Sequence, residues 1–414
     1  MATQIARGPD SIPLRLKLQR TERQRKLKAF ALVLPLLVFV LTAFVLPIGG
    51  MLSKAIYDDT LLTLMPRTTA ALQGWNGNSL PDEAVYDALA NDLRQAWAQN
   101  TAPKIGTRIN YELPGARTQL LTSARKASTL SAGPYKAELI AIDPVLWGQP
   151  EVWHLLMRAN SPYTADYLLR SLDFQYGPQG QIVTTPPQNA IFRDVLLRTF
   201  GISIGVTAAT LLLGFPFAYL MASLPQTTSN ILIIIVILPV WTSPLVSITG
   251  WLVMLQRDGI LNNILMALHI ISQPAQLIFN RIGTVAAMTH VQLSFTLLPI
   301  YSVMKTIPRD HLRAARSLGA GPFYAFRKVY FPQTLPGIAA GCLLSFIMSL
   351  GYYLTPALVG GPTDQMVSSF IAHYMNDELN WGMASALGVI LLTATLLLYY
   401  VYTRLAGADR TKMG

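Results

Sequence analysis

Few residue patterns in this 414-residue chain could carry catalytic chemistry. The sequence has no HExxH pattern for a zinc hydrolase. It also lacks the GxxxxGK[ST] loop that holds nucleotide phosphates. Its single cysteine, Cys342, lies inside an apolar run, so no intramolecular disulfide can form. We therefore expect no catalytic residue, no metal site and no cofactor bound by this chain.

The segment with the most informative residue types is RAARSLGAGPFYAFRKVYFPQTLPG, residues 313–337. Asp310, just after Pro308, predicts the start of a short helix, and Gly319 predicts its left-handed stop. Pro322 predicts the first turn of a second short helix, which Pro332 ends. The sequence therefore predicts two short basic helices between two apolar runs.

This pattern is typical of a docking element, because small residues allow close approach and aromatic rings anchor interfaces. The alternative is a basic loop that only sets membrane orientation and lies at the membrane surface. The residues expected to form the docking surface are Arg313, Ala314, Ala315, Leu318, Gly319, Ala320, Phe323, Phe326, Arg327 and Pro332.

Five windows without a charged residue surround this segment and predict membrane spans. Each of four windows holds one helix of about 20 residues, and the longest holds two. The polar stretch 222–230 predicts the turn inside the longest window, whereas the polar window 259–280 predicts a connection with a short amphipathic helix. The fold class is therefore an all-α polytopic membrane protein with six spans. The windows are 29–53, 199–256, 282–304, 329–363 and 379–403.

The charge distribution sets the expected topology. Basic residues concentrate in the N-terminal arm 1–28, in the loop 305–334 and in the tail 406–414. With six spans these three segments share one side, and the positive-inside rule makes that side cytoplasmic. Both termini are then cytoplasmic, and the segment 54–195 is external. Residues 196–405 form the core with spans two to six.

The external insert carries 12 basic and 13 acidic residues, so it is nearly neutral. Ala84, Leu89, Leu93 and Trp97 recur at helical spacing and predict a helix within 80–100. Two more short helices are expected at PEVWHLLMRA and YTADYLLRSLDF. We expect a small helical cap; the alternative is an extended lid with little core.

A translocation pathway is harder to place, because the spanning windows contain no Asp or Glu. Aromatic faces could handle a cation instead, although core packing or an interfacial belt explains the same rings. Asp364 could lie at the external mouth of the pathway, or it could be a solvated carboxylate of a loop. His290 is expected to bond to a neighbouring helix. The prolines near residue 242 predict either a helix kink or a break that lines the pathway. The candidates are Trp241, Trp251, Tyr301, Tyr352, Tyr353 and Asp364.

The motifs AARSLGA and FRKVYFPQTLPGI resemble the EAA loop of permease subunits of type I ABC importers. Residues 351–392 are similar to permeases of the spermidine/putrescine branch, and the likeness covers about 195–405 and the first span. In that family the loop docks on the ATP-hydrolysing subunit. Arg313 stands where the family has Glu, which reverses one charge of the docking helix.

The resemblance implies a transporter subunit and not an enzyme, located in the bacterial inner membrane. Its implied protein partners are a second permease in a heterodimer, two ATP-binding subunits that hold ATP and Mg²⁺, and an extracytoplasmic substrate-binding protein. The chain is also expected to contact membrane lipid, and no nucleic acid is expected as a partner. Polyamines are the implied cargo, with amino acids or phosphonates as alternatives. A channel or scaffold subunit that needs no ATPase is the alternative from another class.

Overall fold

The computed structural model describes residues 14–130 and 133–408. The chain divides into two units, residues 1–53 and 54–414. In the first unit, α1 (Leu14–Val40), a π-helical turn (Leu41–Val45) and α2 (Leu46–Ser53) form one continuous helix. Its part Glu22–Ser53 is long and apolar enough to span a membrane, which agrees with the predicted first span.

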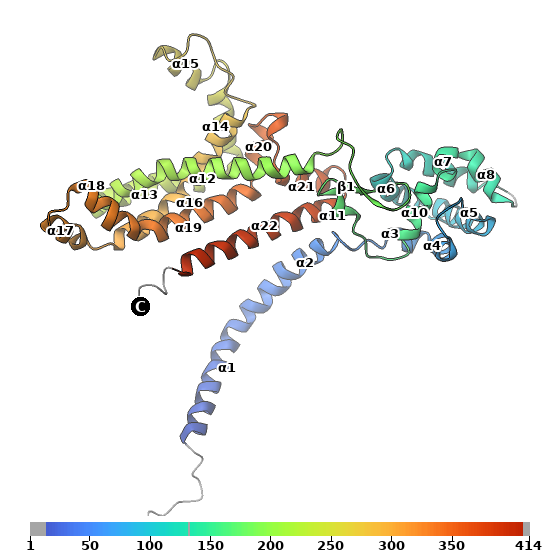
Figure 1. Cartoon of the computed structure of the whole chain (residues 1–414), viewed down its shortest axis with the longest axis horizontal. Coiled ribbons are helices and arrows are strands. Elements are labelled where there is room, and N and C mark those ends of the chain that lie inside the picture. Colours follow the sequence, from blue (N-terminus) through green and yellow to red (C-terminus); the bar gives the residue numbers. More distant parts are fainter. Residues whose placement is uncertain (1–13, 131–132, 409–414) are drawn as a thin grey trace, which may run out of the picture. The chain divides into compact units, whose positions relative to one another are not determined.

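The second unit begins with a helical insert that has its own hydrophobic core, so the alternative of an extended lid with little core is wrong (Figure 1). The largest side chains of this core are Trp147, Trp153 and Tyr86. The helices are α3 (Thr60–Leu64), α4 (Pro66–Ala71), α5 (Glu83–Ala98), α6 (Ala102–Glu112), α7 (Ala116–Ala127), α8 (Tyr135–Ile142), α9 (Pro144–Trp147), α10 (Pro150–Arg158) and α11 (Asp166–Arg170).

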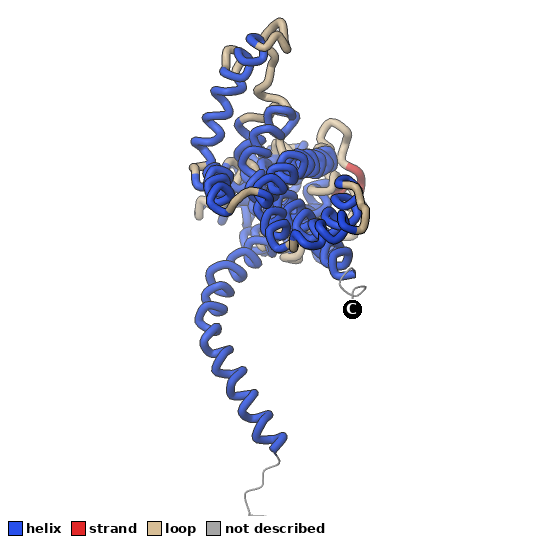
Figure 2. Tube along the Cα trace, turned by 90° about the vertical axis from the view of Figure 1, so that its left-hand side faces the viewer, coloured by secondary structure: helices blue, strands red, loops and turns tan. Residues whose placement is uncertain are grey.

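The predicted helix within 80–100 exists as α5, and Asp82 is its N-cap residue. Of the four residues at helical spacing, Leu89 and Leu93 are buried whereas Ala84 and Trp97 are exposed, and Val85 and Tyr86 add to the buried face. The stretch 163–174 forms only the short α11. It is followed by a hairpin of β1 (Phe174–Tyr176) and β2 (Ile182–Thr184), in antiparallel register. The other elements of the described chain are helices joined by loops (Figure 2).

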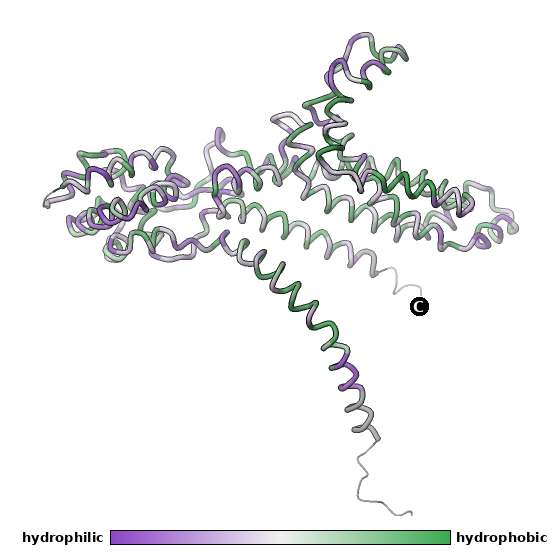
Figure 3. The backbone as a smooth tube through the Cα atoms, turned by 180° about the vertical axis from the view of Figure 1, so that it is seen from behind, coloured by the Kyte–Doolittle hydropathy of each residue, from purple (hydrophilic) through white to green (hydrophobic). Residues whose placement is uncertain are grey.

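The remainder of this unit is a bundle of long helices. The helix α12 (Phe192–Ser223) begins four residues before the predicted core boundary. The others are α13 (Gln226–Trp241), α14 (Pro244–Leu255), α15 (Ile260–Ala267), α16 (Arg281–Thr306), α17 (Arg309–Ser317), α18 (Pro322–Ala325), α19 (Phe331–Gly351), α20 (Leu354–Leu358), α21 (Val367–Asn376) and α22 (Trp381–Ala408). Figure 3 shows apolar residues along the long helices and polar residues around α17.

Helices α12, α16 and α19 pack against one another and form the centre of this bundle (Figure 1). Gly337 and Gly341 of α19 allow the closest approach. A Cβ built on Gly341 would lie 2.5 Å from the carbonyl oxygen of Thr296 in α16. Small residues four apart on one helix face are a typical contact between membrane helices, because they bring the two backbones together. This glycine face therefore fixes the spacing of α16 and α19.

Four continuous helices of the described chain are long and apolar enough to cross a membrane, and a bent pair gives up to five. The bent pair is α13 with α14–α15, which meet at 95°. The expectation of a plain kink near Pro239 and Pro244 is therefore wrong, and the helix breaks at Thr242–Ser243. The predicted turn 222–230 is shorter than expected, since only Leu224–Pro225 separates α12 from α13.

The helix expected as the fourth span is α16, which is 26 residues long but less apolar than the four continuous helices. Its middle carries Thr289, His290, Gln292 and Ser294, which lower its hydropathy. The segment between the last two charge-free windows contains the 10-residue α21. The short helix predicted within 259–280 exists as α15.

Candidate functional site

The helix α17 ends as the sequence predicts. Gly319 has φ +89°, which glycine adopts without strain. Its N–H donates to the carbonyl of Arg316 at 3.0 Å, and the N–H of Ala320 donates to the carbonyl of Ala315 at 3.1 Å. These two bonds form a Schellman cap, which stops the helix sharply. Asp310 lies in the first turn and Arg316 in the last, as the helix dipole favours.

An open groove of about 610 Å³ follows this cap, and its lining includes Ala315, Leu318, Gly319, Ala320 and Tyr324. Leu318 is 89% exposed. Phe323 is 74% exposed and Tyr324 is 61% exposed. Large apolar side chains so exposed beside small residues favour a protein contact. The structure thus brings four predicted docking residues to one groove, with Phe323 beside it.

Other residues predicted for this surface lie elsewhere. Arg313 and Ala314 are exposed on α17, and Arg313 makes an ion pair with Asp310 at 3.4 Å. Phe326 faces inward, with its ring centre 5.6 Å from that of Tyr219 in α12. Its assignment to the docking surface is wrong, because it packs between α12 and the start of α19. Arg327 remains exposed.

The second short helix is not a separate helix. Helical structure is continuous from Pro322 to Gly351, so Pro332 neither ends one helix nor starts another. A π-helical turn, Phe326–Tyr330, precedes Pro332. A wider turn changes the local hydrogen-bond pattern, which accommodates a proline without breaking the helix. Pro336 also lies inside α19.

The six candidate pathway residues do not meet at one site. Trp241 is 83% exposed at the end of α13, and Tyr353 is 42% exposed. Trp251 donates from Nε1 to Nδ1 of His290 at 3.2 Å, which confirms that His290 bonds to a neighbouring helix. The remaining tyrosines lie in separate clusters: Tyr301 contacts Ser229 hydroxyl to hydroxyl at 2.8 Å, and Tyr352 packs beside Met288.

Asp364 is buried and ion-paired, so its description as a solvated loop carboxylate is wrong. Its Oδ1 accepts from Nε of Arg281 at 3.0 Å. Arg198 donates from Nε to the carbonyl of Gln365 at 2.9 Å. These bonds join the starts of α12 and α16 to the turn Pro362–Asp364. We assign Asp364 a structural role at that end of the bundle.

Sequence reasoning missed a string of buried polar side chains between α12, α16 and α19. Thr296 donates to Thr210 at 2.9 Å. Ser349 and Ser345 donate to Oε1 of Gln292 at 2.6 and 3.2 Å. Ser345 and Ser349 continue the four-residue spacing of Gly337 and Gly341, and that spacing was the available signal. The string supplies hydrogen bonds inside a bundle that lipid cannot provide.

A cluster of paired charges inside the insert was also missed, since the count of charges gave only its neutrality. Glu112 accepts from Arg108 at 2.9 Å and from Arg158 at 2.6 Å. Arg108 also pairs with Asp58, and Arg170 pairs with Asp166. Burial opposes ionisation of Glu112, but the guanidinium groups of Arg108 and Arg158 outweigh it and lower its pKa. Three acids and three arginines thus neutralise one another.

Asp166 is the acid of this cluster whose ionised form is stabilised least. It is 1% exposed, and only Arg170 bonds to its side chain among the described residues. Burial and the charge of Glu112 raise the pKa of Asp166 to about 6, against attraction from Arg170 and Arg108. Its carboxyl therefore takes up a proton more readily than an exposed one.

We expect the folded chain to gain stability as the pH falls from about 7 to about 5. The pKa of Asp166 is about 6 when folded and 3.8 ordinarily, so the native state binds the extra proton between these values. The free energy of unfolding then rises as pH falls through that window, by on the order of 1–3 kcal/mol. Below it, the lowered pKa of Glu112 reverses the trend.

The measurement is the melting temperature of the full chain in detergent between pH 5 and 7.5. Asp166→Asn is the comparison, because it removes this group and leaves His154, whose pKa burial lowers. The difference in melting temperature between the unchanged chain and Asp166→Asn should become smaller as the pH falls from 7.5 to 5. Parallel curves would show that Asp166 does not titrate in this window.

Comparison with known proteins places the bundle in a family. Residues 201–408 match the model of the binding-protein-dependent transport system inner membrane component. The spermidine/putrescine transport system permease protein PotB of Haemophilus influenzae is 34% identical over 216 residues, which are 52% of this chain and 76% of the relative. PotB of Escherichia coli K12 is 31% identical over 214 residues, covering 52% and 78%.

Among solved structures, the chain is similar to a bacterial alginate ABC transporter in complex with alginate pentasaccharide-bound periplasmic protein. The sequence identity is 18% and the TM-score is 0.42, with 52% of this chain and 78% of that chain covered.

Proposed function

Because the chain belongs to the family of binding-protein-dependent transport system inner membrane components, we propose that it forms one half of a translocation pathway opened by partner ATPases. The chain is a multi-pass inner membrane protein and an ABC importer permease. The observation that carries the coupling is the exposed apolar groove after α17, with Leu318 at its edge. A cytoplasmic protein that fills this groove would move α17 and α19 together.

The proposed topology has six spans with both termini in the cytoplasm. The bent pair α13 and α14–α15 counts as one span and α16 as another. The polar side chains of α16 support its inclusion, because Thr289, Gln292 and Ser294 are buried in the bundle and need not face lipid. The insert is then external, and the basic α17 is cytoplasmic.

The proposed partners follow from the missing nucleotide site. The sequence has no phosphate-binding loop, so two partner ATPases would bind ATP and Mg²⁺ and hydrolyse the nucleotide. A second permease would complete the pathway as a heterodimer, and an extracytoplasmic binding protein would deliver the cargo. ATP binding would close the ATPase pair and swing the spans between two states through α17.

The proposed cargo is a polyamine or a related small amine. Support comes from the relatives named as spermidine/putrescine permeases. The spanning windows hold no carboxylate, so a transient cation would meet hydroxyl groups, carbonyl groups and aromatic faces. These groups bind a cation only weakly, which suits a pathway that must release its solute.

The test is uptake of radiolabelled spermidine into proteoliposomes that hold this chain with its cognate permease, ATPase and binding protein. We expect uptake that needs ATP and the binding protein and that excess putrescine inhibits. Labelled glutamate and a phosphonate are the comparison solutes. Uptake of either in place of spermidine would refute the cargo, and flux without ATP would support the channel alternative.

A further inference from the structure

A cavity lies where the insert meets the bundle. It measures about 620 Å³, a volume typical of small-molecule sites. One side comes from α6, α10, α11 and the β1–β2 hairpin. The other side comes from Phe192 at the start of α12, Tyr374 of α21, and Asn380 and Met383 at the start of α22. A ligand in this cavity would touch both the insert and the bundle.

Two arginines in the wall have unused donors. Arg158 uses Nη2 to bond Glu112, and Arg170 uses Nε on Asp166 and Nη2 on the carbonyl of Glu112 at 3.2 Å. A guanidinium group has five N–H donors, so most donors of Arg158 are unpaired within the described chain. Arg158 also lies over the ring of Tyr176 at 4.1 Å, which fixes its plane. Both side chains are about one quarter exposed.

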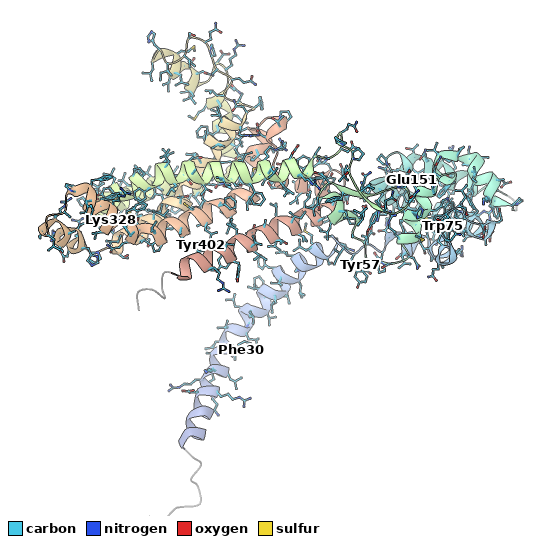
Figure 4. The ribbon with its side chains drawn as sticks, in the orientation of Figure 1. Phe30, Tyr57, Trp75, Glu151, Lys328 and Tyr402 are labelled. Atoms are coloured by element: carbon cyan, nitrogen blue, oxygen red, sulfur yellow. The ribbon has the colours of Figure 1, made fainter. Side chains whose placement is uncertain are left out.

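The buried carboxylates of the wall are already occupied. Both oxygens of Glu112 accept from arginines. Asp173 accepts from the main-chain N–H groups of Phe192 and Arg193 at 3.0 and 2.7 Å, at the start of α12. Neither acid offers a free face to a cation. The remaining acid is the exposed Glu151, which makes no hydrogen bond within the described chain (Figure 4).

The rest of the lining suits a partly apolar body. The phenols of Tyr111 and Tyr374 make no hydrogen bond within the part of the chain that the structure describes, and both line the cavity with Leu113 and Met383. Phenol groups accept or donate, so they can complete the shell of a carboxylate or of a hydroxyl. The cavity thus combines free guanidinium donors, neutral polar groups and apolar walls.

We propose that this cavity binds a small organic carboxylate, held by the guanidinium groups of Arg158 and Arg170. Planar guanidinium groups match carboxylate oxygens in pairs, which makes this recognition geometrically specific. The site is distinct from the amine cargo of the proposed function and stands without it. Its occupant bridges the insert and the starts of α12 and α22, so binding stabilises their contact.

The experiment uses the purified full chain in detergent and isothermal titration with acetate, succinate and citrate, and with putrescine as the cation. We expect at least one carboxylate to bind and putrescine not to bind. Arg170→Gln should weaken carboxylate binding about tenfold or more, because it removes charged donors. Glu151→Gln should strengthen it about threefold, because it removes a like charge from the rim.

Glu138→Gln is the matched control, since Glu138 is exposed on α8 and does not line the cavity; it should change nothing. Because Glu151 is exposed and unbonded, Glu151→Gln should fold normally, which keeps the test valid if Arg170→Gln is unstable. Putrescine binding that Glu151→Gln weakens would overturn the proposal. Failure of all three carboxylates to bind would also overturn it.

Discussion

Gly341→Leu is expected to prevent the bundle from assembling. A Cβ at this position would lie 2.5 Å from the carbonyl oxygen of Thr296, and main chain cannot move aside as a flexible side chain can. Overpacking alone costs about 1–3 kcal/mol. Separating α16 from α19 would also break the bonds that Ser345 and Ser349 make to Gln292. Together these losses approach the whole stability of a typical domain.

The measurement is the yield of monodisperse protein after detergent extraction, with the melting temperature of whatever is recovered. Gly205→Leu is the matched control, because Gly205 lies in α12 and a Cβ there meets nothing within 4 Å. We expect the control to be extracted normally and Gly341→Leu to aggregate. Equal yields and melting temperatures would show that the glycine face does not set the spacing of α16 and α19.

Leu318→Asp is expected to uncouple transport while leaving the protein folded. Leu318 is 89% exposed, so the substitution costs the fold almost nothing. In a complex the carboxylate would be buried without a partner at the edge of the groove. Hot-spot residues of this kind contribute about 2 kcal/mol or more, which predicts a loss of at least about tenfold in substrate-stimulated ATP hydrolysis and in uptake.

Ala315→Trp should also lower substrate-stimulated ATP hydrolysis and uptake, because the tryptophan side chain would fill the groove that Ala315 lines. The matched control is Ile182→Asp, an equally simple change at an exposed position of the β1–β2 hairpin. All three variants should reach the membrane at normal levels. Normal ATP hydrolysis and uptake by Leu318→Asp and Ala315→Trp would remove α17 from the coupling surface.

The parts of the fold that the sequence predicts well depend on local chemistry. Gly319 stops α17 because its position needs a left-handed backbone, and the Schellman bonds follow from that geometry. The charge-free windows located the long helices for an equally local reason, since a spanning helix satisfies its own backbone groups. The helical spacing of apolar residues within 80–100 located α5 in the same way.

The parts that escaped prediction depend on contacts between distant segments. Pro332 reads as a helix end, yet the preceding π-helical turn keeps the helix continuous. Phe326 reads as an exposed anchor, but the rings of α12 cover it. Asp364 reads as a loop carboxylate because Arg281, its partner, is 83 residues away.

The candidate site also contains residues that a local sequence pattern can identify and residues that only folding brings together. The groove residues Ala315, Leu318 and Gly319 are neighbours in sequence, so a local pattern could identify them. The cavity of the insert could not be identified, because Arg158 and Arg170 meet Glu112 only after three helices have packed. A count of charges gives the neutrality of that cluster but not its pairing.

We infer that a cytoplasmic ATPase docks at the groove after α17. The direct test is a photo-cross-linking amino acid placed at Leu318 in cells that express the whole transport system, with Ile182 as the control position. We predict a light-dependent adduct at Leu318 that carries an ATP-binding protein, identified by mass spectrometry, and no such adduct at Ile182. The absence of an ATP-binding protein from the Leu318 adduct would show that the groove is not where the ATPase docks.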